Sequence, residues 1–192
     1  MTGLDVKDDL HTYLRDARET LVWKLDGLGE YAIRRPLTPT GTNLLGLVKH
    51  SGSTNLRYFG RVFGRADDES LSWLSGGAEP IGEMWAAPGE GRDAIVDACR
   101  RAWDLADATI RELPLEAEGR VPWWGEGTVT LHRVLVHVTA ETQRHAGHAD
   151  IVRELIDGSV GLMEGVDNLH TRDLAERQRF RDQVEAAALQ FQ

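Results

Sequence analysis

The chain has 192 residues and a formal net charge of −9, with 22 basic side chains against 31 acidic ones. This balance disfavours binding to nucleic acid or to an acidic membrane surface. The single cysteine, Cys99, excludes an intrachain disulfide, and the opening residues MTGLDVKDDL have neither the basic nor the apolar region of a secretory leader. Every apolar run is far shorter than the ~20 residues of a membrane span. We therefore expect one cytoplasmic domain that covers residues 1–192.

Helical periodicity dominates the sequence, and strand signals are weak. Apolar residues recur every three or four positions in five segments, which are 5–28, 43–63, 92–113, 129–156 and 171–189. Gly27 and Gly29 mark the end of the first segment, Pro114 closes the third, and Gly158 is a C-cap signal after the fourth. The sequence predicts five helices joined by loops of unequal length.

One connection and one of these segments allow more detailed predictions. The region between Gly64 and Gly91 contains four glycines, two prolines and two tryptophans, which indicates a long packed connection that forms part of the wall of a site. The third helix has a predicted buried stripe made of Ile95, Ala98, Cys99, Ala102, Leu105, Ala106 and Ile110.

The expected fold class is all-α, a four-helix bundle with long connecting loops and an extra C-terminal helix. Helices 5–28 and 92–113 supply mainly apolar packing, and helices 43–63 and 129–156 carry the polar residues that point inward. The C-terminal helix has a sparse apolar stripe that includes Leu174, Phe180 and Val184. We expect this helix to pack on the bundle or on a second subunit, and the latter would make a homodimer.

The strongest functional signal is a column of polar residues on the helix at 129–156. His137, Glu141, His145 and His148 follow one another at spacings of four, four and three. Residues four apart lie about 6 Å apart on a helix surface, so one divalent ion can be shared by neighbouring members. The column is too long for all four, because His137 and His148 lie roughly 16 Å apart along the axis. A third ligand must come from another segment, and His50 is the leading candidate.

A buried carboxylate among imidazoles costs several kcal/mol unless it is compensated, and a divalent cation is the simplest compensation. Two imidazoles and one carboxylate leave Zn²⁺ with an open position, which is a catalytic pattern, and Ni²⁺ or Fe²⁺ suit the same ligands. The other histidines, His11, His132 and His170, are expected to be ordinary surface or hydrogen-bonded residues.

The segments LVKHSGSTNLRYFG and ETQRHAGH resemble motifs of the DinB-like superfamily. The resemblance covers nearly the whole chain and points to an actinobacterial branch of unknown function, related to mycothiol-dependent maleylpyruvate isomerase and to thiol-dependent transferases. It implies that His50, Glu141 and His145 are the metal ligands. Glutamate at position 141, where many members have histidine, is similar to the isomerase branch. The additional C-terminal domain of that isomerase is not expected in this chain.

The neighbours of the ligand set have several interpretations. Three roles are open to His148, which are a fourth ligand, a proton shuttle and a hydrogen-bonding support for a ligand. We predict that it lies outside the ligand set and is the catalytic proton carrier. His137 is predicted to hydrogen-bond the Glu141 carboxylate. Arg144 and Arg153 are expected on a solvated helix face, with a substrate carboxylate as the less favoured partner.

The apolar residues near the proposed site are expected mostly in the core. These are Tyr58, Phe59, Trp123 and Trp124, and one of the two tryptophans is a candidate for the pocket wall. Cys99 lies on an apolar stripe and is expected to be inert packing rather than a nucleophile.

Two classes of function fit these residues. The first is a metal-dependent enzyme that activates a low-molecular-weight thiol for transfer to an electrophile, as a mycothiol-type S-transferase or isomerase, with a metal-dependent hydrolase as its variant. The second is a non-catalytic, stress-associated metal-binding protein. The expected partners are a small-molecule thiol and an electrophile, with mycothiol as the candidate cosubstrate.

Overall fold

The computed structural model describes residues 5–65, 68–125, 127–167 and 169–192. The chain divides into two compact units, Met1–Ser159 and Val160–Gln192. The helices and strands of the first unit are α1 (Val6–Trp23), α2 (Glu30–Arg34), α3 (Leu44–Asn55), a π-helical turn η1 (Leu56–Gly60), 3-10 turns η2 (Arg61–Phe63), η3 (Glu69–Ser75) and η4 (Gly82–Met84), α4 (Arg92–Glu112), β1 (Glu118–Gly119), the 3-10 turn η5 (Pro122–Trp124), β2 (Val129–Thr130) and α5 (Leu131–Asp157).

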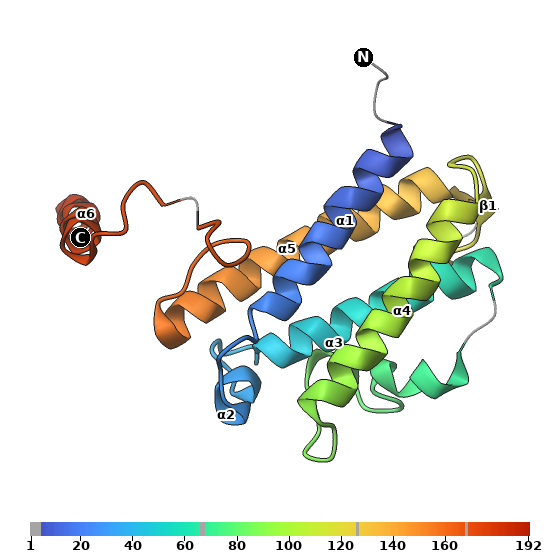
Figure 1. The fold of residues 1–192 in the computed structure, drawn as a ribbon, viewed down its shortest axis with the longest axis horizontal. Coiled ribbons are helices and arrows are strands. Elements are labelled where there is room, and N and C mark those ends of the chain that lie inside the picture. Colours follow the sequence, from blue (N-terminus) through green and yellow to red (C-terminus); the bar gives the residue numbers. More distant parts are fainter. Residues whose placement is uncertain (1–4, 66–67, 126, 168) are drawn as a thin grey trace. The chain divides into compact units, whose positions relative to one another are not determined.

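The long helices α1, α3, α4 and α5 form the bundle of the first unit (Figure 1). α1 packs along α5, α3 packs along α4, and α3 also contacts α5. Strands β1 and β2 pair antiparallel, with Glu118 opposite Thr130, in the connection between α4 and α5. The predicted all-α bundle is confirmed, and each predicted long helix begins within a few residues of its expected start, whereas α3 ends at Asn55, eight residues before its expected end.

The buried faces follow the predicted periodicity. On α1, Leu14, Ala17 and Leu21 are buried. On α4, the predicted stripe is buried except at Leu105, whose side chain is 39 % exposed. The apolar contacts form two clusters, and on α5 one cluster ends at Val138 while the other begins at Ala146. The polar positions of α5 between these two residues therefore interrupt an otherwise apolar core.

Helix α3 lies deep in the bundle. All its residues except His50 are buried. A Cβ atom at Gly52 would lie 2.5 Å from the Cys99 sulfur, and one at Gly46 would lie 1.9 Å from the carbonyl oxygen of Met84. Because glycine leaves this space free, α3 approaches α4 and the connection at η4 closely enough to bury its own backbone.

The segment predicted as one helix over 43–63 changes type along its length. After Asn55 the α-helix gives way to the π-turn η1 and then to the 3-10 turn η2. The Asn55 amide donates to the Ser51 carbonyl at 2.7 Å, and its Oδ1 accepts from Arg18 at 2.6 Å. A π-turn is wider than an α-turn and rotates the residues that follow it. Tyr58 and Phe59, which lie in this turn, are both buried as predicted.

The connection between α3 and α4 is packed, as its composition predicts. Leu71 and Leu74 of η3 are fully buried. Lys49 of α3 is also buried, and its ammonium lies 2.8 Å from the Glu90 carboxylate and 3.0 Å from the Gly82 carbonyl oxygen. These contacts hold the connection between α3 and α4 against helix α3. The short helix α2 was not predicted, because five residues are too few to establish a period.

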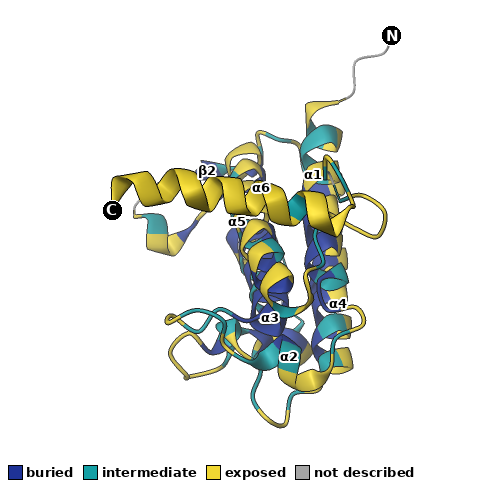
Figure 2. Cartoon of the chain, turned by 90° about the vertical axis from the view of Figure 1, so that its left-hand side faces the viewer, coloured by how far each residue is buried: buried dark blue, intermediate teal, exposed yellow. Residues whose placement is uncertain are grey.

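The second unit contains α6 (Leu174–Ala188) and the 3-10 turn η6 (Leu189–Phe191). Asp173 caps α6 by accepting from the backbone N–H of Ala175 at 2.7 Å. No residue of α6 is buried, and Figure 2 shows it exposed along nearly its whole length. Among the described residues, no helix is long and apolar enough to cross a membrane.

Candidate metal centre

Three of the predicted site residues converge between α3 and α5. His50 comes from the middle of α3, and Glu141 and His145 come from consecutive turns of α5. One carboxylate oxygen, Glu141 Oε1, lies 2.7 Å from His50 Nε2 and 2.8 Å from His145 Nε2. One ligand atom from each residue lies within 4.8 Å of the other two. These three residues are hereafter called the triad.

The three side chains of the triad are half-buried, and one of them, Glu141, carries a negative charge. The exposed side-chain fractions are 14 % for His50, 22 % for Glu141 and 17 % for His145. Burial alone would raise the pKa of Glu141, but hydrogen bonds from His145 and His50 outweigh it and lower that pKa to about 2. The carboxylate is therefore ionised at neutral pH. Its second oxygen, Oε2, is buried without a hydrogen-bond partner among the described residues, as is Nδ1 of each imidazole.

One further side chain touches the triad and was missed by sequence reasoning. The Thr54 hydroxyl lies 3.3 Å from His50 Nε2. Thr54 is buried and stands one helical turn after His50. The spacing of four was a signal that could have found it, because residues four apart share one helix face.

The two remaining members of the α5 column lie at opposite ends of the triad. His148 is exposed, and its ring centroid lies 5.4 Å from that of His145. Partial burial, together with the charges of His145 and Arg144, lowers the pKa of His148. His148 lies outside the group of mutually close ligand atoms.

The prediction that His137 hydrogen-bonds the Glu141 carboxylate is wrong, because Glu141 Oε1 meets only His50 and His145 and its Oε2 has no hydrogen-bond partner among the described residues. His137 packs instead against aromatic neighbours. Its ring centroid lies 5.2 Å from Tyr58 and 4.6 Å from Trp124. Trp123 completes the group, because its indole N–H donates to the Tyr58 hydroxyl at 3.1 Å. Tyr58, Trp123, Trp124 and His137 are hereafter called the aromatic cluster. The prediction that these tryptophans are mostly core is wrong for Trp123, which is 51 % exposed.

The two arginines of α5 differ from each other. Arg144 is exposed, as expected. Arg153 is 7 % exposed, so the expectation of a solvated face is wrong for it. Its guanidinium donates to the carbonyl oxygens of Lys24 and Asp26 at 2.9 and 2.8 Å and pairs with Asp157. Arg153 thus binds the C-terminal end of α1, where free carbonyls favour a cation.

His132, His170 and Cys99 lie in the environments that the sequence predicts. His132 and His170 are exposed. Cys99 is fully buried and donates to the Val48 carbonyl at 3.3 Å. Burial raises the pKa of the Cys99 thiol to about 12, so it is a poor nucleophile near neutral pH.

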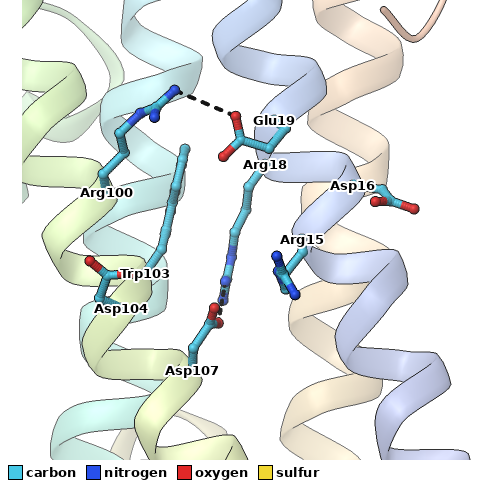
Figure 3. A pocket seen from close by; sticks show the side chains of 8 residues that line it. All are labelled: Arg15, Asp16, Arg18, Glu19, Arg100, Trp103, Asp104 and Asp107. Carbon is cyan, nitrogen blue, oxygen red and sulfur yellow. Dashed lines mark hydrogen bonds and ion pairs between the residues drawn. The ribbon is translucent and has the colours of Figure 1, made fainter.

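A second polar cluster lies in a groove between α1 and α4 (Figure 3). Arg18 crosses this groove and lies 2.6 Å from Asp107, which also pairs with His11 at 2.8 Å. The groove, about 300 Å³ in volume, is lined by Arg15, Asp16, Arg18, Glu19, Arg100, Trp103, Asp104 and Asp107. Its lining contains no residue of the triad, and its positive and negative charges are nearly balanced.

Together, an all-α bundle and two imidazoles that meet one carboxylate across facing helices define a helical-bundle protein with a candidate metal centre. The profile of the mycothiol-S-transferase family matches residues 9–158, and the chain belongs to this family. The family is DinB-like, which confirms the resemblance seen in the two sequence motifs. The matched range contains all three triad residues. No curated protein matches the chain.

Proposed function

We propose that the protein is a metal-dependent thiol transferase whose divalent ion is bound by His50, Glu141 and His145. The observation that carries this proposal is the convergence of three ligand-type atoms within 4.8 Å from two facing helices. Membership of the mycothiol-S-transferase family supports a small-molecule thiol of the mycothiol type as cosubstrate. The reaction is an S-transfer or a thiol-dependent isomerisation.

The side chains present fit a divalent cation. Two imidazole nitrogens and one carboxylate oxygen are typical ligands of Zn²⁺, and Ni²⁺ and Fe²⁺ accept the same set. Glu141 Oε2 is buried without a hydrogen-bond partner in the described part of the chain. A cation next to this carboxylate would balance its negative charge. Neutral imidazoles carry no charge and cannot do so. We expect Zn²⁺ as the native ion.

A cation at the triad supplies Lewis-acid stabilisation of a thiolate near neutral pH. In the proposed transfer, the thiol releases its proton, the sulfur forms a bond to an electrophilic carbon, and the leaving group departs with the electrons of its own bond to that carbon. His148 takes the thiol proton on a ring nitrogen and releases it to solvent. Its exposed ring, next to that of His145, suits this role.

Metal content and thiol transfer, measured on the same samples, test the proposal. The wild-type chain should contain one divalent ion and should conjugate mycothiol to a chloronitroaromatic electrophile. The double variant Glu141→Ala, His145→Ala should lose both properties, and His132→Ala, which changes an exposed histidine of the same helix, should keep both. Full metal occupancy in the double variant would exclude the ligand assignment, and metal binding without thiol transfer would exclude the activity.

A single substitution separates the proposed role of His148 from that of a ligand. His148→Gln should keep the bound metal while lowering the rate of thiol transfer, because the proton carrier is removed and the triad is left intact. Metal affinity and transfer rate across pH measure the two effects. A loss of metal affinity of about 10- to 100-fold would instead identify His148 as part of the metal's support.

We further propose a homodimer, which rests on the exposed apolar side chains of α6, including Leu174, Phe180 and Val184. Light scattering should give twice the chain mass of 21.4 kDa, and a monomer at high concentration would exclude the dimer. That one domain spans residues 1–192 and that the protein is cytoplasmic stay predictions, which limited proteolysis and cell fractionation can test.

A further inference from the structure

The most exposed ring of the aromatic cluster, Trp123, is held in place by a hydrogen bond although it is 51 % exposed. Its N–H donates to the Tyr58 hydroxyl, and the two rings meet nearly at right angles with centroids 5.4 Å apart. Tyr58 is only 7 % exposed and contacts Trp124 and His137 as well. A buried tyrosine therefore anchors an indole that half faces solvent.

The aromatic cluster lies next to the triad along the same two chain segments. Tyr58 lies in the π-turn η1, four residues beyond Thr54, whose hydroxyl lies 3.3 Å from His50 Nε2, and its ring contacts that of His137. On the facing helix, His137 stands one turn before Glu141. Residues one turn apart lie about 6 Å apart on a helix surface. A small molecule that reacts at the triad can therefore extend along α3 and α5 onto the aromatic rings.

Two arginines give this end of the site a positive charge within a chain whose net charge is −9. The Arg57 guanidinium lies 5.8 Å from the ring centroid of Trp123, and that of Arg133 lies 5.3 Å from the ring centroid of Trp124. Arg57 has a distant acidic partner, Glu83, at 3.9 Å, and its buried Nε has no hydrogen-bond partner among the described residues. Among those residues, Arg133 has no carboxylate within ion-pair distance. These guanidinium groups remain available to an anionic ligand.

Building on the proposed thiol transfer, we propose that the aromatic cluster with Arg57 and Arg133 is the electrophile subsite. It takes a planar, conjugated electrophile that carries an anionic group. The planar part stacks on Trp123, since aromatic rings prefer offset or edge contacts with one another. The anionic group faces the guanidiniums. A cationic ligand does not suit the subsite, because arginine side chains already lie next to both tryptophan rings.

A pair of inert analogues tests this subsite without requiring catalysis. The probes are 3,5-dinitrobenzoate and its neutral counterpart 1,3-dinitrobenzene, titrated calorimetrically into the zinc-loaded full chain and into the same chain after chelation. The anion should bind at least about fivefold more tightly, and this preference should survive chelation. A preference that disappears with the metal would mean that the carboxylate binds the ion, and it would overturn the subsite.

Matched variants locate the binding. Trp123→Ala should weaken both probes about tenfold, and Arg133→Gln should weaken only the anion, by about threefold. Tyr31→Ala changes another exposed ring that also has an arginine nearby, and Arg101→Gln changes an exposed arginine of α4, so neither should matter. Unchanged affinity in Trp123→Ala, or equal affinity of the wild type for both probes, would overturn the inference.

The reaction itself separates this inference from the proposed function. With 4-chloro-3,5-dinitrobenzoate, the thiol sulfur bonds to the ring carbon that carries chlorine, chloride leaves with the bonding electrons, and the thiol proton passes to His148. The rate should exceed that with 1-chloro-2,4-dinitrobenzene, and Arg133→Gln should reduce this advantage. Selective probe binding without transfer would overturn the proposed activity alone, and transfer without selectivity would overturn the subsite alone.

Discussion

The bundle contains two polar seams, each with a carboxylate and at least one histidine, and they differ in how the carboxylate is balanced. Between α1 and α4, Asp107 pairs with His11 and with the guanidinium of Arg18, which also binds Asn55. Between α3 and α5, Glu141 meets only imidazoles, and its Oε2 has no hydrogen-bond partner within the described ranges. In the first seam the permanent positive charge of Arg18 balances the carboxylate within the chain, although Arg18 Nε is buried without a hydrogen-bond partner among the described residues. The second seam, around Glu141, is suited to receive a cation. The presence or absence of a permanent cation beside the carboxylate therefore distinguishes a structural polar cluster from a ligand-binding one in this fold.

The largest expected effect comes from a substitution that breaks the first seam, between α1 and α4. Arg18→Ala removes a guanidinium that is 2 % exposed, leaves Asn55 Oδ1 without its donor and leaves Asp107 with His11 as its remaining partner. Removing one member of a buried ion pair costs about 3–5 kcal/mol, so the free energy of unfolding should fall by that amount. Urea denaturation measures it. Arg15→Ala, an exposed change on the same helix, should alter stability by less than about 0.5 kcal/mol.

The second effect comes from adding metal to the other seam. At a free Zn²⁺ concentration of 100 times its dissociation constant, binding to the native state adds about 2.7 kcal/mol. For a domain of this size the unfolding temperature should rise by roughly 5–10 °C. The Glu141→Ala, His145→Ala variant should show no such rise, and Asp107→Asn should retain it. Calorimetric scans with and without zinc provide the measurement.

The smallest effect is in the pH dependence of stability. Burial alone would raise the pKa of Asp107, but the hydrogen bond from His11 and the charge and hydrogen bond of Arg18 together lower it. A lowered native pKa adds stability that is fully present above the unfolded pKa of ~3.9 and is lost as pH falls through the native value. Asp107→Asn should therefore flatten the acid side of the stability profile. An unchanged acid slope would contradict the assigned ion pair, and the exposed Asp16→Asn is the control.

Much of the bundle was predictable because its helices are amphipathic over many turns. Leu14, Ala17 and Leu21 repeat at the helical period, and their burial on α1 follows from it. The triad was predictable for a similar reason, since Glu141 and His145 share a helix face and only a residue from another helix could join them. The pairing of His50 with this face came from reasoning about the ligand set and from the motif resemblance.

The features that were not predictable depend on contacts between distant segments. The π-turn after Asn55 has no periodicity of its own, and the Arg18 contact that accompanies it joins residues 37 positions apart. Arg153 was expected in solvent because arginine side chains are usually exposed. Its guanidinium is buried instead, because it donates hydrogen bonds to the free carbonyl oxygens at the end of α1. Trp123 was expected in the core because tryptophan is apolar, and only its bond to Tyr58 reveals why it can stay exposed.

The proposed function requires His50, Glu141 and His145 to bind one divalent ion. Crystals of the zinc-loaded protein, measured on both sides of the zinc absorption edge, test it most directly. We expect one anomalous peak per chain, bonded to both imidazoles and to the Glu141 carboxylate. A peak in the groove between α1 and α4, or no peak at the triad in crystals whose zinc content equals one ion per chain, would exclude this ligand set.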